Sequence, residues 1–65
     1  MSEIFKYDWG QEVCVVTTAP ASMRPGQSGS VCGMREKDDA NIYIVEFSDG
    51  WSTEIPEDFL CEEKD

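Results

Sequence analysis

Apolar side chains recur at every second position in several short segments of this chain, which is the pattern of strands that bury one face. The clearest is residues 42–47, where Tyr43, Val45 and Phe47 share one side and aromatic and β-branched residues predominate. Residues 12–18 are similar, with valines on the expected inner face. Further strands are expected at residues 30–36, 52–56 and 60–62.

Turn-forming residues separate these segments. Asp49-Gly50 predicts a two-residue hairpin turn, because both residues of such a turn can require positive φ. Pro56 ends the following strand, since it has no N–H to donate, and residues 57–59 can form one turn of 3₁₀ helix. Gly33 indicates a bulge or a close approach. Loops are expected at 19–29, which is rich in Pro and Gly, and at 37–41.

The chain has 65 residues, a length that suits one domain with a small core. Five short strands with a 3₁₀ corner before the last predict an all-β fold, a five-stranded SH3-like small barrel spanning 1–65. The ends, 1–9 and 62–65, are expected to be loose. The sequence shows neither a long apolar span nor a secretion signal, so we expect no membrane partner and a cytoplasmic location.

Charge narrows the classes of partner. Fourteen acidic residues against five basic ones give a net charge of −9. Such a field repels phosphate, so we expect no nucleic-acid partner. High charge favours solubility, and it equally suits a cationic partner, either a basic protein surface or a small organic cation.

The three cysteines, Cys14, Cys32 and Cys61, are widely spaced, and the chain has no histidine. This composition supports neither a zinc site nor a disulfide framework, so reduced thiols are expected. A catalytic cysteine would need a cationic neighbour to lower its pKa, which an acidic chain without histidine offers poorly. We therefore expect no catalytic residue, no metal and no cofactor.

Four motifs carry a resemblance to a known class: GQEVCVV, RPGQSGSVCGM, YIVEFSDG and IPEDFL, which together span residues 10–60. The chain resembles small bacterial SH3-like proteins and, more loosely, KOW and Tudor modules. The resemblance implies the fold. It does not imply one function, because this fold carries many unrelated activities.

The Tudor likeness implies a pocket for small organic or methylated cations, which aromatic faces attract and a carboxylate assists. Tyr43 and Phe47 are expected in the core, because they occupy inward strand positions. The candidate residues for such an aromatic and acidic pocket are Tyr7, Trp9, Trp51, Asp49 and Glu54.

The chain is also similar in length and predicted fold to the plasmid-borne type II dihydrofolate reductases, which work as homotetramers. Their Val-Gln-Ile-Tyr motif is absent, since the comparable segment 52–56 reads STEIP. An acidic pore would repel the two anionic molecules that this reductase binds. The sequence therefore disfavours an enzyme, although the likeness keeps homo-oligomers open.

The favoured hypothesis is a non-enzymatic interaction or self-assembly module. Side chains on the outward positions of two strands form a possible apolar stripe for a protein partner or a second copy. These residues are Ile42, Ile44, Val16 and Cys14. The positions of Trp9 and Trp51 discriminate between this surface and the cation pocket: convergence on an acid favours the pocket.

Overall fold

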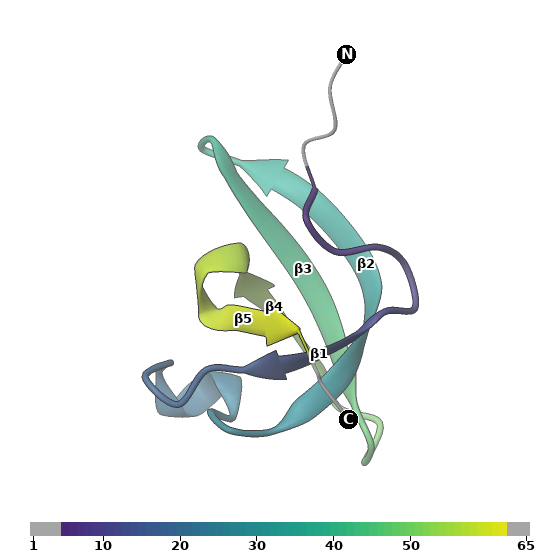
Figure 1. The fold of residues 1–65 in the computed structure, drawn as a ribbon, viewed down its shortest axis with the longest axis vertical. Helices are drawn as coiled ribbons and strands as arrows, with labels where there is room; N and C mark the ends of the chain where they lie inside the picture. Colours follow the sequence, from purple (N-terminus) through teal and green to yellow (C-terminus); the bar gives the residue numbers. More distant parts are fainter. Residues whose placement is uncertain (1–4, 63–65) are drawn as a thin grey trace.

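The computed structural model describes residues 5–62, which form a single antiparallel sheet with no α-helix (Figure 1). The sheet order is β4-β3-β2-β1-β5, and among the described residues no pairing joins the two outer strands. The strands are β1 (Glu12–Val15), β2 (Ser28–Lys37), β3 (Ala40–Phe47), β4 (Ser52–Pro56) and β5 (Leu60–Glu62). The all-β prediction is confirmed, whereas the sheet is not closed into a barrel by strand pairing.

The inner face of this coiled sheet forms the core. Tyr43, Val45 and Phe47 of β3 are buried, as their alternation predicts. The remaining buried side chains are Tyr7, Val13, Val15, Ala19, Val31, Ile55 and Leu60. The register of β2 against β3 shifts between Val31 and Gly33, so the predicted bulge is confirmed. A Cβ on Gly33 would lie 2.8 Å from Cδ1 of Ile44, and only glycine fits there without a shift.

Two one-turn 3₁₀ helices connect the strands: η1 (Ala21–Met23), within the expected 19–29 loop, and η2 (Glu57–Phe59). The second is the 3₁₀ corner that the sequence predicts before the last strand. It carries the chain from β4, at one edge of the sheet, to β5 at the other.

One hairpin turn lies within the loop expected at 37–41, and the other differs from its prediction. Asp38 and Asp39 both have positive φ, 52° and 66°, so they form the two-residue turn between β2 and β3. At Asp49-Gly50 only Gly50 has positive φ, 89°. Its N–H donates to the Phe47 carbonyl at 2.9 Å, and Phe47 N–H donates to the Trp51 carbonyl at 2.8 Å. This is a three-residue loop with a glycine bulge, so the two-residue turn expected there is wrong.

The first strand is shorter than expected, because the chain turns after Val15. The Ala19 N–H donates to the Val16 carbonyl at 3.2 Å, which closes a turn where residues 16–18 were expected to be extended. The second strand, β2, begins at Ser28, two positions before the expected 30, because Ser28 pairs with Cys14 of β1.

The segment before β1 is anchored on the core. The Tyr43 hydroxyl accepts hydrogen bonds from the backbone N–H groups of Lys6 (2.8 Å) and Tyr7 (3.1 Å) and donates to Glu57 Oε2 (2.9 Å). Tyr7 is only 2% exposed, and its hydroxyl donates to the Leu60 carbonyl at 3.2 Å. Of the ends expected to be loose, residues 1–4 and 63–65 lie outside the described residues. Within residues 5–62 no helix has the length and apolar character to cross a membrane.

Candidate functional site

Trp9 stands on a hydrogen-bonded turn just before β1. The backbone N–H of Trp9 donates to Asp8 Oδ1 at 2.8 Å. Two hydrogen bonds between Asp8 and Gln11 close the turn: the Gln11 N–H donates to the Asp8 carbonyl, and the Asp8 N–H donates to Gln11 Oε1. The Gly10 N–H ties the turn to the Val31 carbonyl at 2.7 Å. The Trp9 side chain is nevertheless 65% exposed. The backbone is thus ordered while the indole stays in solvent.

A hollow of about 420 Å³ lies beside this indole and is called the Trp9 groove below. Its lining residues are Phe5, Lys6, Tyr7, Asp8, Trp9 and Met34. Phe5 and Tyr7 each meet the Tyr43 ring edge-on, with centroids 5.9 and 5.3 Å apart. The aromatic wall of the groove is therefore supported from the core.

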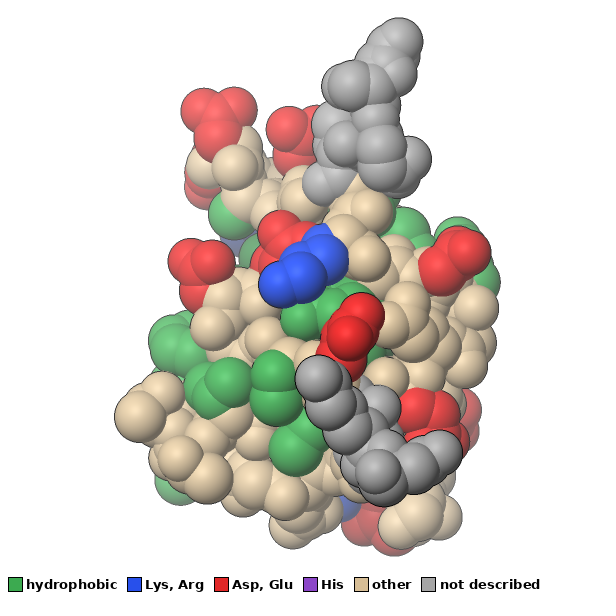
Figure 2. Space-filling view, viewed as in Figure 1, with side chains coloured by type: hydrophobic (Ala, Val, Ile, Leu, Met, Phe, Trp, Pro, Cys, Tyr) green, Lys and Arg blue, Asp and Glu red, His purple; other side chains and the backbone are tan. Residues whose placement is uncertain are grey.

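A second hollow, of about 180 Å³, lies at the β2–β3 hairpin end and carries three carboxylates. It is called the acidic hollow and is lined by Asp39, Ala40, Asn41, Pro56, Glu57 and Asp58. Glu57 links it to the Trp9 groove, because Glu57 Oε2 also accepts the Lys6 N–H at 3.1 Å. Figure 2 shows acidic side chains spread over the visible face with few basic ones between them.

Trp51 lies in a different environment, called the Trp51 site. Its ring stacks on Phe47 with centroids 5.9 Å apart and an interplanar angle of 20°. The Arg24 guanidinium carbon lies 4.3 Å from the Trp51 centroid, and Nη1 of Arg24 contacts both Asp49 oxygens, at 3.0 and 2.9 Å. The chain's own cation thus occupies the aromatic and acidic arrangement that suits an external one.

Electrostatics at the Trp51 site agree with this arrangement. The pKa of Asp49 lies below its usual value because the Trp51 backbone N–H donates to Oδ1, and the Arg24 guanidinium lowers the pKa further. Arg24 has φ 57° and ψ 62°, a left-handed conformation that is unfavourable for a residue with a Cβ. Arg24 ends η1 in this conformation, and its backbone N–H donates to the Ala21 carbonyl at 3.1 Å.

The five pocket candidates are therefore divided. Trp51 and Asp49 come together at the Trp51 site. Tyr7 and Trp9 both line the Trp9 groove, although Tyr7 is buried in the core. Glu54 of β4 forms an ion pair with Arg35 of β2 at 2.9 Å, reaching across β3. Within residues 5–62 no ring contact joins the two tryptophans.

The candidates for the apolar stripe fall in two places. Ile42 and Ile44 are half-buried on the outer face of β3, and Ile44 pairs with Gly33. Cys14 pairs with Ser28, five residues away along β2, a separation of roughly 16 Å at strand spacing. Val16 is partly buried and packs against the core. These four side chains do not form one continuous stripe.

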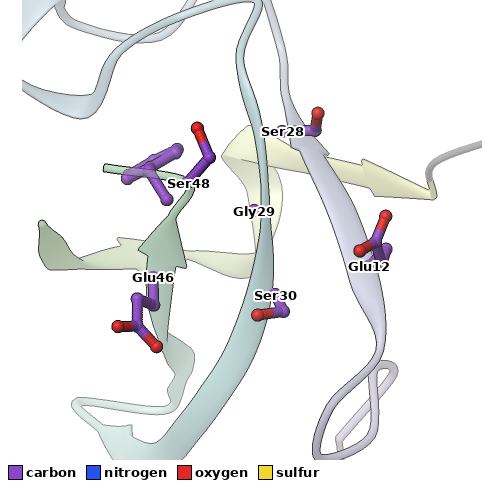
Figure 3. Close-up of a pocket in the computed structure, with 7 residues that line it drawn as sticks. Glu12, Ser28, Gly29, Ser30, Glu46 and Ser48 are labelled. Atoms are coloured by element: carbon purple, nitrogen blue, oxygen red, sulfur yellow. The ribbon is translucent and has the colours of Figure 1, made fainter. Parts of the chain in front are cut away.

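One surface feature gives no signal in the sequence. Glu12, Ser30 and Glu46 come from three strands and lie in one row of the sheet, because Ser30 pairs with both glutamates. They line a hollow of about 290 Å³ with Ser28 and Ser48 (Figure 3). Only the strand register reveals this row, since the residues are far apart in the chain.

Comparison with protein-family models, with curated proteins and with solved structures finds no match to this chain. Among residues 5–62 no three Cys, Asp or Glu side chains are grouped so as to hold a metal ion. A functional proposal therefore rests on the geometry of the Trp9 groove, the acidic hollow and the Trp51 site.

Proposed function

We propose that this chain is a non-enzymatic interaction module that binds a basic segment of a protein partner in the Trp9 groove. The observation that carries the proposal is the 65% exposed Trp9 indole on an ordered turn beside a groove of about 420 Å³. Tryptophan is among the residues that contribute most to binding when a partner covers them. Because the turn is already hydrogen-bonded, little ordering cost remains on binding.

The charge of the chain indicates the chemistry of the partner. A net charge of −9 repels a second copy and attracts a basic segment. Asp39 and Asp58 in the acidic hollow can pair with Arg or Lys while an apolar side chain packs on Trp9. Glu57 adds negative charge there, although its oxygens already accept hydrogen bonds within the chain. A partner segment with one aromatic or aliphatic residue next to basic residues fits both hollows.

The element order supports the same class of function. Five strands, a 3₁₀ corner before the last strand and a long loop between β1 and β2 are the order of an SH3-like small barrel. This fold serves many unrelated functions, so the likeness supports a small binding scaffold and not a particular ligand.

Selection from a displayed random-peptide library tests the proposal directly. The full chain should enrich peptides that combine an apolar residue with Arg or Lys. Trp9→Ala should weaken those peptides about 10-fold or more, since truncating a central anchor costs about 2 kcal/mol or more. Trp51→Ala is the matched control and should keep the affinity within about threefold. Enriched peptides that bind Trp9→Ala as well as the parent chain would exclude the Trp9 groove.

A second candidate function is the binding of a guanidinium or methylated ammonium group at the Trp51 site. It is favoured by the Arg24 guanidinium that already lies 4.3 Å from the Trp51 centroid beside Asp49. An external cation must displace Arg24, so Arg24→Ala should bind methylguanidinium more tightly than the parent chain does. Calorimetry on Arg24→Ala and on Arg24→Ala/Trp51→Ala separates this site from nonspecific attraction: equal binding by both would reject it.

A further inference from the structure

Strand pairing places two of the three cysteines opposite each other. Cys14 of β1 and Cys61 of β5 are direct partners in the antiparallel register, although 47 positions separate them in the chain. Val13 and Val15 are buried, so Cys14 lies on the outer face of β1. Paired residues point to the same face, and Cys61 therefore lies beside Cys14 on that face.

The separation suits a covalent bond. Directly paired residues on antiparallel strands have Cα atoms about 4.5–5.5 Å apart, within the range of about 4.4–6.8 Å seen in disulfides. The Cys61 Sγ already lies 3.4 Å from the Cys14 carbonyl oxygen. The Cys14 Sγ contacts the Val15 carbonyl oxygen at 3.7 Å, so the disulfide requires rotation of the Cys14 and Cys61 side chains about their Cα–Cβ bonds.

Exposure separates this pair from the third cysteine. Cys61 is exposed and Cys14 is half-buried, so an oxidant reaches the pair from solvent. Cys32 is also exposed, but it lies on β2 four residues beyond Ser28, the residue that pairs with Cys14. That offset is roughly 13 Å at strand spacing, which is too far for a disulfide.

We infer that Cys14 and Cys61 are a redox modification site, a dithiol that hydroperoxides convert to a reversible disulfide. The Cys61 sulfur attacks the peroxide, the O–O bond breaks, and a sulfenic acid and water form. The Cys14 thiol then displaces the sulfenic oxygen as a second water. In total, two thiols and one hydrogen peroxide give one disulfide and two waters. A dithiol reductant reverses the step by thiol–disulfide exchange.

The disulfide would act on the smallest strand of the sheet. β5 has three residues, pairs only with β1 among the described strands, and carries the core residue Leu60. A bond between positions 14 and 61 would hold β5 on β1 and enclose most of the chain in one loop. Closing a long loop restricts the unfolded chain and so stabilises the folded one.

Peptide mapping of the native chain after treatment with hydrogen peroxide tests the inference. We expect a Cys14–Cys61 linked peptide, an intact mass lower by two hydrogen atoms, and one reactive thiol remaining of the three. Dithiothreitol should restore all three. The melting temperature should rise by about 5 °C or more on oxidation.

Three variants complete the design. Cys32→Ser is the matched control and should still form the linked peptide and gain thermal stability. Cys14→Ser and Cys61→Ser should gain none. Peroxide treatment that yields only separate sulfinic or sulfonic acids, disulfide-linked dimers or a bond to Cys32 would overturn the inference, and so would the same rise in melting temperature in Cys61→Ser.

Discussion

The regions around the two tryptophans contain the same types of residue, but the two indole rings differ in their contacts and exposure. Trp9 and Trp51 each adjoin a turn glycine with positive φ and lie near an acid, a base and other aromatic rings. Trp51 is stacked on Phe47, covered by Arg24 and 41% exposed. Trp9 is 65% exposed, and no ring or cation of residues 5–62 stacks on it.

The position of the nearest cation explains why Trp51 is covered and Trp9 is not. Near Trp9 the available cation is Lys6, whose Nζ lies over the Tyr7 ring, 5.5 Å from its centroid. Near Trp51 it is Arg24, whose planar group stacks on the indole and also reaches both oxygens of Asp49. An exposed aromatic residue thus indicates a binding surface only after the side chains of the same chain have been placed around it.

The largest effect is expected at the anchor of the Trp9 groove. Tyr43→Phe removes the hydroxyl that accepts the Lys6 and Tyr7 N–H groups, and the buried Tyr7 N–H loses its partner. We expect a loss of about 1–3 kcal/mol in the free energy of unfolding. Urea unfolding measures it.

Tryptophan fluorescence tests whether Tyr43→Phe affects the region around Trp9 and leaves the region around Trp51 unchanged. In a Trp51→Phe background, acrylamide quenching of Trp9 should increase when Tyr43→Phe is added. In a Trp9→Phe background, quenching of Trp51 should stay the same. Equal changes at both tryptophans would show that the two regions are not independent.

A smaller loss is expected at the Trp51 site. Arg24→Ala removes a cation–π contact of about 0.5–1 kcal/mol at a surface position and should expose Trp51 to acrylamide. Arg35→Ala is the matched control: Arg35 pairs with Glu54 at the surface, and its loss should change stability by less than about 1 kcal/mol. If Trp51 is quenched equally in both variants, Arg24 does not shield it.

Alkaline pH should weaken the region of the Trp9 groove. Burial raises the pKa of Tyr7 and Tyr43 above the ordinary 10.0, and the negative charge of Glu57 raises both further. The unfolded chain therefore loses these protons first, so the stability is fully present below pH 10 and falls as pH rises toward the folded pKa values. The ultraviolet absorbance of tyrosinate should appear at higher pH in the folded chain than in urea. Coincident titrations would contradict the expectation.

Acid should affect the Trp51 site, with the smallest effect of the four. The pKa of Asp49 is lowered below 3.8 by the Trp51 N–H and by Arg24, so its contribution is present above pH 3.8 and is lost as pH falls through the folded pKa. The stability difference between the parent chain and Asp49→Asn should shrink below pH 3.8. A stability difference that is constant from neutral to acid pH would show that the ionised Asp49 carboxylate does not stabilise the Trp51 site.

The sequence by itself determined the local elements of this protein. Alternation predicted the buried side of β3, Gly33 predicted the bulge, and Pro56 predicted the corner before β5. Each of these depends on backbone sterics and on side chains a few residues apart, which the order of residues contains directly.

Tertiary structure alone decided which side chains meet. The contact between Arg24 and Asp49 spans 25 positions, and that between Cys14 and Cys61 spans 47. The apolar stripe expected from Cys14 and Ile44 was divided for the same reason, since β2 separates them in register. Such contacts depend on strand register and on the coiling of the sheet, and both are set by packing of the whole core at once.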